Sequence, residues 1–196
     1  MNFFTLSALV NTITCSFLGI FVFSKNRKSE VNKIFFLYTL AIFSWSGSYF
    51  LWQTSHNEVS ALFWTKALTA CAIFIPVFYT QLVYGVIGRK KEKYLFYLLY
   101  VVAVTFFALS FGYWLVKSLE PRAGFEFWPV AGSGYKYYLS FWFSLVIYST
   151  GLLFYSLFHT QGQRKIQLLY FLIASIIGYS GGITNFPLWY NIQIRP

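Results

Sequence analysis

The sequence predicts an all-α membrane protein, a polytopic transmembrane bundle of six helices in a single domain, residues 1–196. Apolar stretches of about 20 residues, the length that a helix needs to cross the hydrocarbon core, recur along the chain. The chain is 58% hydrophobic and only 10% charged, whereas a soluble domain carries about 25% charged residues. Three short basic clusters, at residues 25–33, 89–93 and 164–165, lie between the apolar stretches.

The distribution of the basic residues predicts how the chain crosses the membrane. Ten Lys and Arg residues lie in the three clusters, and four lie in the other connections, namely Lys117, Arg122, Lys136 and Arg195. Because cytoplasmic loops carry the excess of Lys and Arg, we expect the clusters in the cytoplasm and the N-terminus outside. The net charge of +10 does not indicate nucleic-acid binding, because the basic residues flank apolar segments and form no continuous basic face.

The expected spans are residues 3–23, 34–53, 61–85, 94–116, 137–159 and 166–189. The first is preceded by no basic residue and followed by a basic cluster, which indicates an inserted helix and not a cleaved signal peptide. The second ends at a short polar turn, and the third contains Pro76, which predicts a bend. Basic clusters precede the fourth and the sixth, and the longest connection precedes the fifth.

Tyr and Trp residues gather near the ends of these spans, where aromatic rings with one polar edge favour the headgroup region. They include Tyr49, Trp52, Tyr138, Trp189 and Tyr190. We interpret most of them as an interfacial belt and not as a binding site.

The longest connection, residues 117–136, combines several kinds of residue. Its proline and glycine residues exclude a regular helix throughout, and its aromatic residues, including Trp128, argue against a simple solvated linker. Glu120, Arg122 and Glu126 add charges. The segment therefore suits either contact with a ligand or a loop that lies on the lipid headgroups.

The sequence contains no catalytic, cofactor or metal-binding motif. His56 and His159 fall on opposite sides of the membrane in the expected topology, and neither has a Cys or carboxylate partner at ligand spacing. Cys15 and Cys71 lie within spans and read as small buried residues. We therefore expect no enzymatic activity, no cofactor and no metal.

Lys66 is the one charge expected inside a span, about five residues from the outer end of the third helix. At that depth its four-carbon stem can reach the interface. Charged groups inside spans also tend to face the protein interior, and Thr69 lies on the same helix face. Lys66 is thus expected either to extend to the headgroups or to hold a ligand or the 120–126 segment.

Small residues recur on one face of the sixth span, namely Ala174, Gly178, Gly181 and Gly182, followed by the polar Asn185. Small residues at intervals of four allow two membrane helices to approach closely, so close helix packing is the first interpretation. The alternative is a bend, since Gly181 and Gly182 are followed by Pro187 and weaken the outer end of the helix.

Short segments from the second span to the end of the chain share motifs with one family. They are Trp45–Tyr49, Ala61–Lys66, Pro76, Gly88–Arg89, Gln163–Gln167, Gly181–Pro187 and Ile194–Pro196. Together they resemble the N-terminal seven-helix sensor region of bacterial histidine kinases. That family continues with a seventh helix and usually with a dimerisation helix, which bears the phospho-accepting His, and an ATP-binding domain. The chain stops before the seventh helix, so the resemblance covers a sensor part without kinase motifs.

The resemblance implies a multi-pass sensor of a two-component-type signalling protein in the bacterial inner membrane, with a homodimer formed through the missing C-terminal region. The expected partners are the lipid bilayer and a small apolar or amphipathic signal, relayed by helix repacking. The expected ligand-contacting residues are Lys66, Thr69, Glu120, Arg122, Glu126, Trp128 and Asn185. The alternatives are a small-solute transporter, which calls for a polar or charged site at the midplane, and a structural membrane partner without a ligand.

Overall fold

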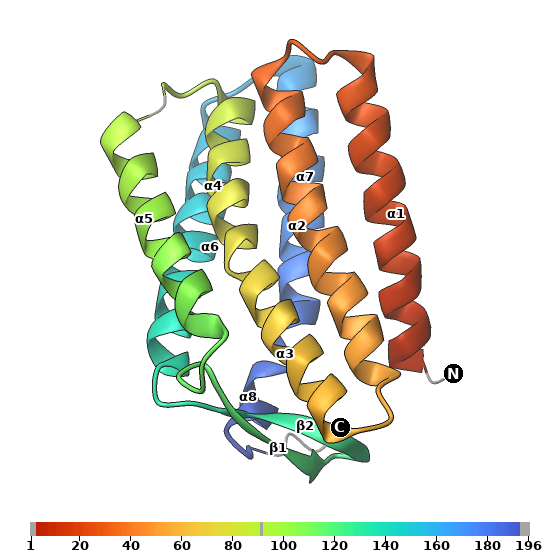
Figure 1. The fold of residues 1–196 in the computed structure, drawn as a ribbon. Helices are drawn as coiled ribbons and strands as arrows, with labels where there is room; N and C mark the ends of the chain where they lie inside the picture. Colours follow the sequence, from red (N-terminus) through yellow and green to blue (C-terminus); the bar gives the residue numbers. More distant parts are fainter. Residues whose placement is uncertain (1–2, 91, 193–196) are drawn as a thin grey trace.

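The computed structural model describes residues 3–90 and 92–192, in which long helices run side by side and a β-hairpin covers one end (Figure 1). The elements are α1 (Phe3–Lys25), α2 (Glu30–Gln53), α3 (Glu58–Ala72), α4 (Phe74–Ile87), α5 (Lys93–Ser110), β1 (Val116–Arg122), β2 (Phe125–Ala131), α6 (Tyr135–Phe158), α7 (Gly162–Ile183) and α8 (Phe186–Trp189). Lys91 of the second basic cluster and the closing Ile194-Arg195-Pro196 motif lie outside the described residues.

Six helical segments in the described part of the chain are long and apolar enough to cross a membrane. They are α1, α2, α3 with α4 (Glu58–Ile87), α5, α6, and α7 with α8 (Gly162–Trp189). Large apolar side chains such as Phe17, Ile147 and Ile177 lie exposed on their outer surfaces, as a helix surrounded by lipid requires. The predicted class is confirmed, and the chain is a multi-pass membrane protein.

The basic clusters lie together at one end of the bundle. The α1–α2 turn, the α4–α5 connection and the start of α7 are at this end, and the hairpin is at the other (Figure 1). The start of α1 at Phe3 and helix α8 also lie at the hairpin end (Figure 1). That the basic end faces the cytoplasm stays a prediction from the charges.

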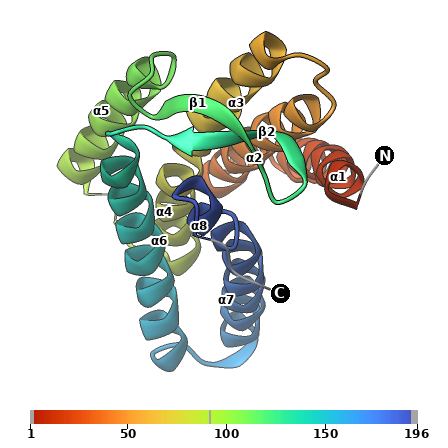
Figure 2. The same ribbon diagram turned by 90° about the horizontal axis from the view of Figure 1, so that it is seen from below.

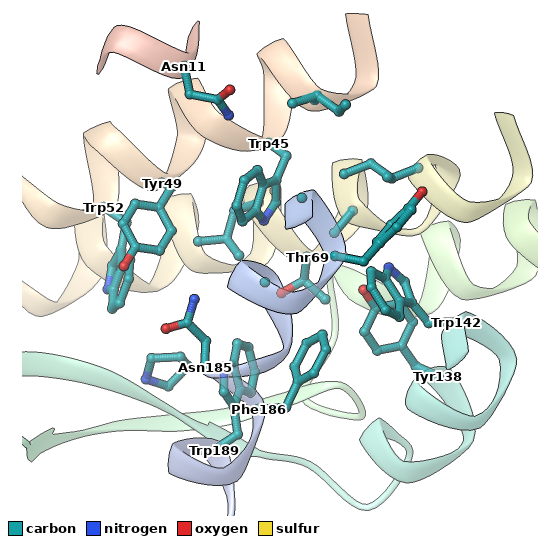
Figure 3. Close-up of a pocket in the computed structure, with 18 of the residues that line it drawn as sticks. Asn11, Trp45, Tyr49, Trp52, Thr69, Tyr138, Trp142, Asn185, Phe186 and Trp189 are labelled. Carbon is teal, nitrogen blue, oxygen red and sulfur yellow. The ribbon is translucent and has the colours of Figure 1, made fainter. Parts of the chain in front are cut away.

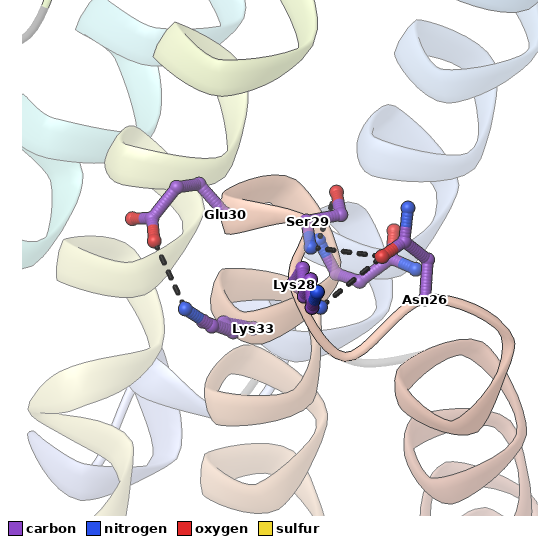
Figure 4. A network of polar contacts seen from close by, with 6 residues as sticks. Asn26, Lys28, Ser29, Glu30 and Lys33 are labelled. Carbon is purple, nitrogen blue, oxygen red and sulfur yellow. Dashed lines mark hydrogen bonds and ion pairs between the residues drawn. The ribbon is translucent and has the colours of Figure 1, made fainter.

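Side chains fix the α1–α2 turn at the basic end (Figure 4). Asn26 Oδ1 accepts hydrogen bonds from the backbone N–H groups of Lys28 and Ser29 at 3.1 and 3.2 Å. Ser29 then caps α2, its hydroxyl accepting from Asn32 N, which satisfies one of the free N–H groups of a helix start. Lys33 and Glu30 add an exposed ion pair at 3.2 Å.

The third span consists of two helices that meet at Ile73, three residues before Pro76. A proline inside a helix lacks the N–H that would bind the carbonyl four residues earlier, and its ring clashes with that carbonyl. For Pro76 this carbonyl belongs to Ala72, the last residue of α3. Proline chemistry therefore accounts for the position of the break.

The half of the bundle nearer the basic end is held by polar pairs between α4 and α6. The Tyr84 and Tyr148 hydroxyls lie 2.6 Å apart, and Ser149 donates to Thr80 Oγ1 at 2.8 Å. Tyr79 and Thr150 form a third pair at 3.2 Å. Between membrane helices such hydrogen bonds add to van der Waals packing, so these three pairs stabilise the contact between α4 and α6.

The connection between α5 and α6 is not helical, as predicted, but most of it forms an antiparallel hairpin that the sequence analysis did not predict. Ala123 and Gly124 have φ angles of +48° and +83° and form a two-residue turn between the paired residues Arg122 and Phe125. Positive φ at both turn positions matches the twist of a hairpin. Pro121 and Pro129 are accommodated because each strand of a two-stranded sheet is an edge strand.

The hairpin crosses the ends of the helices instead of extending away from them (Figure 2). Both strands contact α3, and β2 also contacts α8. Trp52 at the end of α2 donates its indole N–H to the Phe127 carbonyl at 2.8 Å. The hairpin and α8 together therefore cover one end of the space between the helices.

Candidate ligand-binding site

A cavity of about 300 Å³ lies in the half of the bundle next to the hairpin (Figure 3). Its lining comes from α1, α2, α3 and α4 on one side, from α6, α7 and α8 on the other, and from β2. Small-molecule sites in proteins are concave, mostly apolar and about 300–1,000 Å³ in volume. The cavity is at the lower end of that range, which suits a small molecule.

Helix α2 supplies an aromatic wall to the cavity. The wall consists of Tyr38, Ile42, Trp45, Tyr49 and Trp52. They are three or four residues apart, so they share one face of the helix. The interfacial-belt interpretation is therefore wrong for Tyr49 and Trp52, which face the cavity together with Tyr138 and Trp189. The three-to-four spacing was the sequence signal that could have identified this wall.

Helix α7 forms the opposite wall with small residues. Ala174, Gly178 and Gly182 line the cavity, and a Cβ atom added at Gly178, Gly181 or Gly182 would meet no atom within 4 Å. The close helix contact expected from this stripe is thus not made by the described residues. The absent side chains instead leave room in the cavity.

The walls formed by α2 and α7 are only loosely joined to each other. The Tyr38 and Tyr179 hydroxyls lie 3.4 Å apart, at the far limit of a hydrogen bond. By contrast, α1 and α2 approach so closely that a Cβ atom at Gly19 would clash with the Thr39 hydroxyl. The contact between α2 and α7 is therefore more open than the contact between α1 and α2.

Strand β2 and helix α8 close the cavity at the hairpin end. Trp128 and Pro129 come from β2, and Phe186 and Trp189 come from α8. The Trp189 ring stacks on Tyr135 with centroids 4.2 Å apart and planes 6° from parallel. Helix α8 follows the end of α7 at Ile183, and Pro187 stands in its first turn. The predicted bend region thus carries two aromatic side chains to the cavity.

The structure separates the predicted ligand-contacting residues into two groups. Thr69, Trp128 and Asn185 line the cavity. Glu120, Arg122, Glu126 and Lys66 do not line it.

The charged residues of the hairpin have structural partners or face outwards. Arg122 forms an ion pair with Glu120 at 2.8 Å and donates to the carbonyls of Leu188 and Trp189. Glu126 is exposed. Arg122 therefore joins the hairpin to α8, and its contact with a ligand stays a prediction.

Lys66 extends away from the cavity towards the end of α5. Its ammonium group donates to the Phe111 carbonyl at 3.1 Å and lies 4.1 Å from the centroid of the Tyr113 ring. These partners differ from the 120–126 segment that the sequence suggested. A role for Lys66 in ligand binding stays a prediction that these contacts do not support.

The cavity is uncharged but contains free polar groups. Its lining includes no Asp, Glu, Lys, Arg or His. Within the described part of the chain, several lining side chains make no hydrogen bond through their polar atoms; they are Trp45, Tyr49, Tyr135, Tyr138, Trp142, Asn185 and Trp189. The Trp128 indole N–H is buried and also has no hydrogen-bond partner there. The site thus combines aromatic surface with unused hydrogen-bonding capacity.

A comparison with protein families gives a match over nearly the whole chain. The model of the N-terminal 7TM region of histidine kinase matches residues 7–195. No curated protein and no solved structure gives a significant match. The matched segment contains every residue that lines the cavity, from Asn11 to Trp189, and it confirms the resemblance predicted from the short motifs.

Proposed function

Since the chain belongs to the family of N-terminal 7TM regions of histidine kinases, we propose that it senses a small apolar or amphipathic molecule for a two-component signalling system. The family is a sensor region and not the catalytic part of these kinases, so the role assigned to the chain is binding and relay. The proposed location is the bacterial inner membrane, with the hairpin end outside. The homodimer implied by the family resemblance is part of the same proposal.

The observation that carries this proposal is the aromatic cavity between α2 and α7. Apolar lining favours a molecule that partitions into the bilayer or carries a large apolar part. A small-solute transporter is expected to have a polar or charged site at the midplane, whereas this cavity has no charged lining residue and lies in the half of the bundle next to the hairpin (Figure 3). The cavity therefore favours a receptor over the transporter alternative.

The relay mechanism follows from the position of the cavity. A molecule in the cavity contacts the α2 wall and the α7 wall at the same time. If it fits one spacing of these helices better than another, its binding shifts the population towards that spacing. The long Tyr38–Tyr179 contact opposes such a shift only weakly. The turn between α6 and α7 lies at the basic end of the bundle (Figure 1), so movement of α7 reaches the proposed cytoplasmic side.

A cavity-filling substitution tests this mechanism without knowledge of the signal. Gly178→Phe directs a ring towards the cavity, because Gly178 lines the cavity and a Cβ atom at this position meets no atom within 4 Å. Gly181→Phe is the matched control, because Gly181 lies on the same helix with equally open surroundings but does not line the cavity. Spin labels at the exposed Lys28 and Gln161, in a Cys15→Ser, Cys71→Ser background, report the distance between the two turns at the basic end.

We expect Gly178→Phe to shift the distance between the labels by roughly 2 Å, the size of ordinary helix shifts. Gly181→Phe should leave the distance unchanged. The measurement is double electron–electron resonance on the spin-labelled chain in lipid nanodiscs. Identical distance distributions for the parent chain and both variants would contradict the proposed relay through α7.

A further inference from the structure

We infer that the cavity takes an uncharged, flat, apolar molecule whose carbonyl oxygens accept hydrogen bonds from the walls, the chemistry of a quinone. This inference rests on the proposed function and names the class of molecule that the sensor would detect. It follows from three properties of the lining, which are its lack of charge, its surplus of donors and its aromatic surface.

The lack of charge excludes a strongly ionic ligand. No charged side chain lines the cavity, and Arg122 of the hairpin already contacts Glu120 and α8. Moving an ion from water into such a site without an opposite charge costs several kcal/mol. The preferred molecule is therefore neutral.

All of the free polar groups in the lining can donate a hydrogen bond. The indoles of Trp45, Trp142 and Trp189 can only donate, and none of them has a partner among the described residues. Asn185, between α7 and α8, adds a free amide group. This amide points into the cavity in Figure 3. Each of these groups gains a hydrogen bond if the molecule brings an acceptor oxygen.

The smaller polar side chains of the lining do not compete for that oxygen, because they are already paired. Thr69 donates to the Thr65 carbonyl at 2.8 Å, and Ser175 donates to the Phe171 carbonyl at 2.8 Å. Asn11 donates to Ser46 at 2.8 Å. The unused donors are thus on the large aromatic residues and on Asn185, so a carbonyl oxygen would be bound beside ring surfaces.

The aromatic surface favours a flat molecule. Nearly half of the lining residues are aromatic, and their rings meet mostly edge to face, as for Trp142 and Phe186 at 5.5 Å and 76°. Flat conjugated molecules can stack on or slot between such rings. A flexible chain alone would fill the same volume with fewer favourable ring contacts.

A carbonyl oxygen in this position has two natural sources. The inferred source is a flat compound such as a quinone dissolved in the bilayer, and the competing source is the ester group of a phospholipid, which offers the same acceptor without a flat ring system. Both sources use the same hydrogen-bonding chemistry. The experiment therefore compares nanodiscs made from ester-linked phosphatidylcholine with nanodiscs made from its diether analogue, which has no carbonyl groups.

The probes are 2,3-dimethyl-1,4-naphthoquinone and 2,3-dimethylnaphthalene, which share a ring system and differ in the two carbonyls. The methyl groups block addition of the Cys15 thiol, which lies in the lining. Thermal unfolding of the full chain, followed by circular dichroism, measures binding, because a ligand of the folded state raises Tm. We expect the quinone to raise Tm by a given amount at a concentration about fivefold lower than the hydrocarbon needs, the effect of about one hydrogen bond. The ratio of these two concentrations is the preference for the quinone.

The donors are tested with Trp142→Phe and Asn185→Leu. Asn185→Leu removes the amide donor at equal side-chain size, and Trp142→Phe removes the indole N–H together with part of the ring system. Each should reduce the preference for the quinone by roughly fivefold. Trp64→Phe is the control, because Trp64 is partly exposed and does not line the cavity. The control should keep the full preference.

The two lipids then separate the sources. The same preference in both lipids supports the inferred flat carbonyl compound. A preference that appears only in diether lipid would mean that a lipid ester group occupies the cavity, and it would overturn the inference of a flat molecule. Equal or absent effects of the two probes in both lipids, or equal preferences in all three variants, would overturn the inference. The distance change in Gly178→Phe does not depend on carbonyl chemistry, so the proposed function can stand if this inference fails.

Discussion

Arg122 of the hairpin and Leu188 of α8 are joined by a hydrogen bond of 2.9 Å from Nη1 to the carbonyl oxygen. The same nitrogen also lies 3.3 Å from the Trp189 carbonyl. The Leu188 carbonyl also accepts from the Asn191 backbone N–H at 3.2 Å, so Arg122 adds a second donor at the end of α8, where carbonyls lack partners within the helix. Because both elements close the cavity, this contact fixes the position of its hairpin end.

We predict that Arg122→Gln loosens α8. The shorter, neutral side chain cannot maintain the contact, and loss of hydrogen bonds from a charged donor destabilises the local structure by about 1–2 kcal/mol. Hydrogen exchange of the backbone amides of residues 186–192 should therefore become faster. The Arg122 side chain is only 13% exposed, so solvent compensates little for the loss.

The matched control for this prediction is Glu120→Gln, which removes the other partner of the ion pair. The Glu120 side chain is 53% exposed, and exposed ion pairs contribute about 0–1 kcal/mol. Exchange in α8 should change little in this variant. Equal acceleration in both variants would mean that the ion pair, and not the bond to α8, holds the two elements together.

The second prediction concerns Gly19, where α1 packs tightly against Thr39 of α2. Gly19→Leu should destabilise the fold by about 1–3 kcal/mol, the usual cost of adding atoms to a packed contact, because even a Cβ atom at this position clashes with Thr39. Gly151→Leu is the control, since a Cβ atom at Gly151 meets nothing within 4 Å. Thermal unfolding in detergent should show a lower Tm for Gly19→Leu alone.

The class of the fold could be predicted because it depends on local properties. A helix that crosses a bilayer needs a fixed apolar length, and basic residues mark its ends. The break near Pro76 also follows from local proline chemistry. The family match indicates a sensor region, but it does not locate the binding site within that region.

The cavity could be predicted only in part, because it depends on which helix faces meet. Thr69, Trp128 and Asn185 were identified as polar or aromatic exceptions in their segments, and they line it. Tyr49 and Trp52 of α2 were interpreted as interfacial, since aromatic residues near helix ends suit both locations. The hairpin was missed because Pro121 and Pro129 usually interrupt strands, and only an edge strand accepts them.

The third prediction concerns the orientation of the bundle. Single cysteines at His56 and Ser133 should react with a membrane-impermeant maleimide added to intact cells, whereas cysteines at Asn26, Lys90 and Gln163 should not. All five positions are exposed. The labelling uses a background in which Cys15 and Cys71 are replaced by Ser. Labelling of Lys90→Cys before cell lysis would reverse the orientation inferred from the basic clusters.

The last prediction separates Lys66 from the cavity. Its ammonium group contacts the Phe111 carbonyl and the Tyr113 ring at the end of α5, so Lys66→Gln should remove these contacts and leave the lining intact. We expect a small loss of stability, because the contact is exposed, and an unchanged distance shift when Lys66→Gln is combined with Gly178→Phe. Lys66→Arg, which keeps the charge, is the control for folding. If Lys66→Gln folds normally but abolishes the shift, while Lys66→Arg keeps it, the positive charge acts on the site after all.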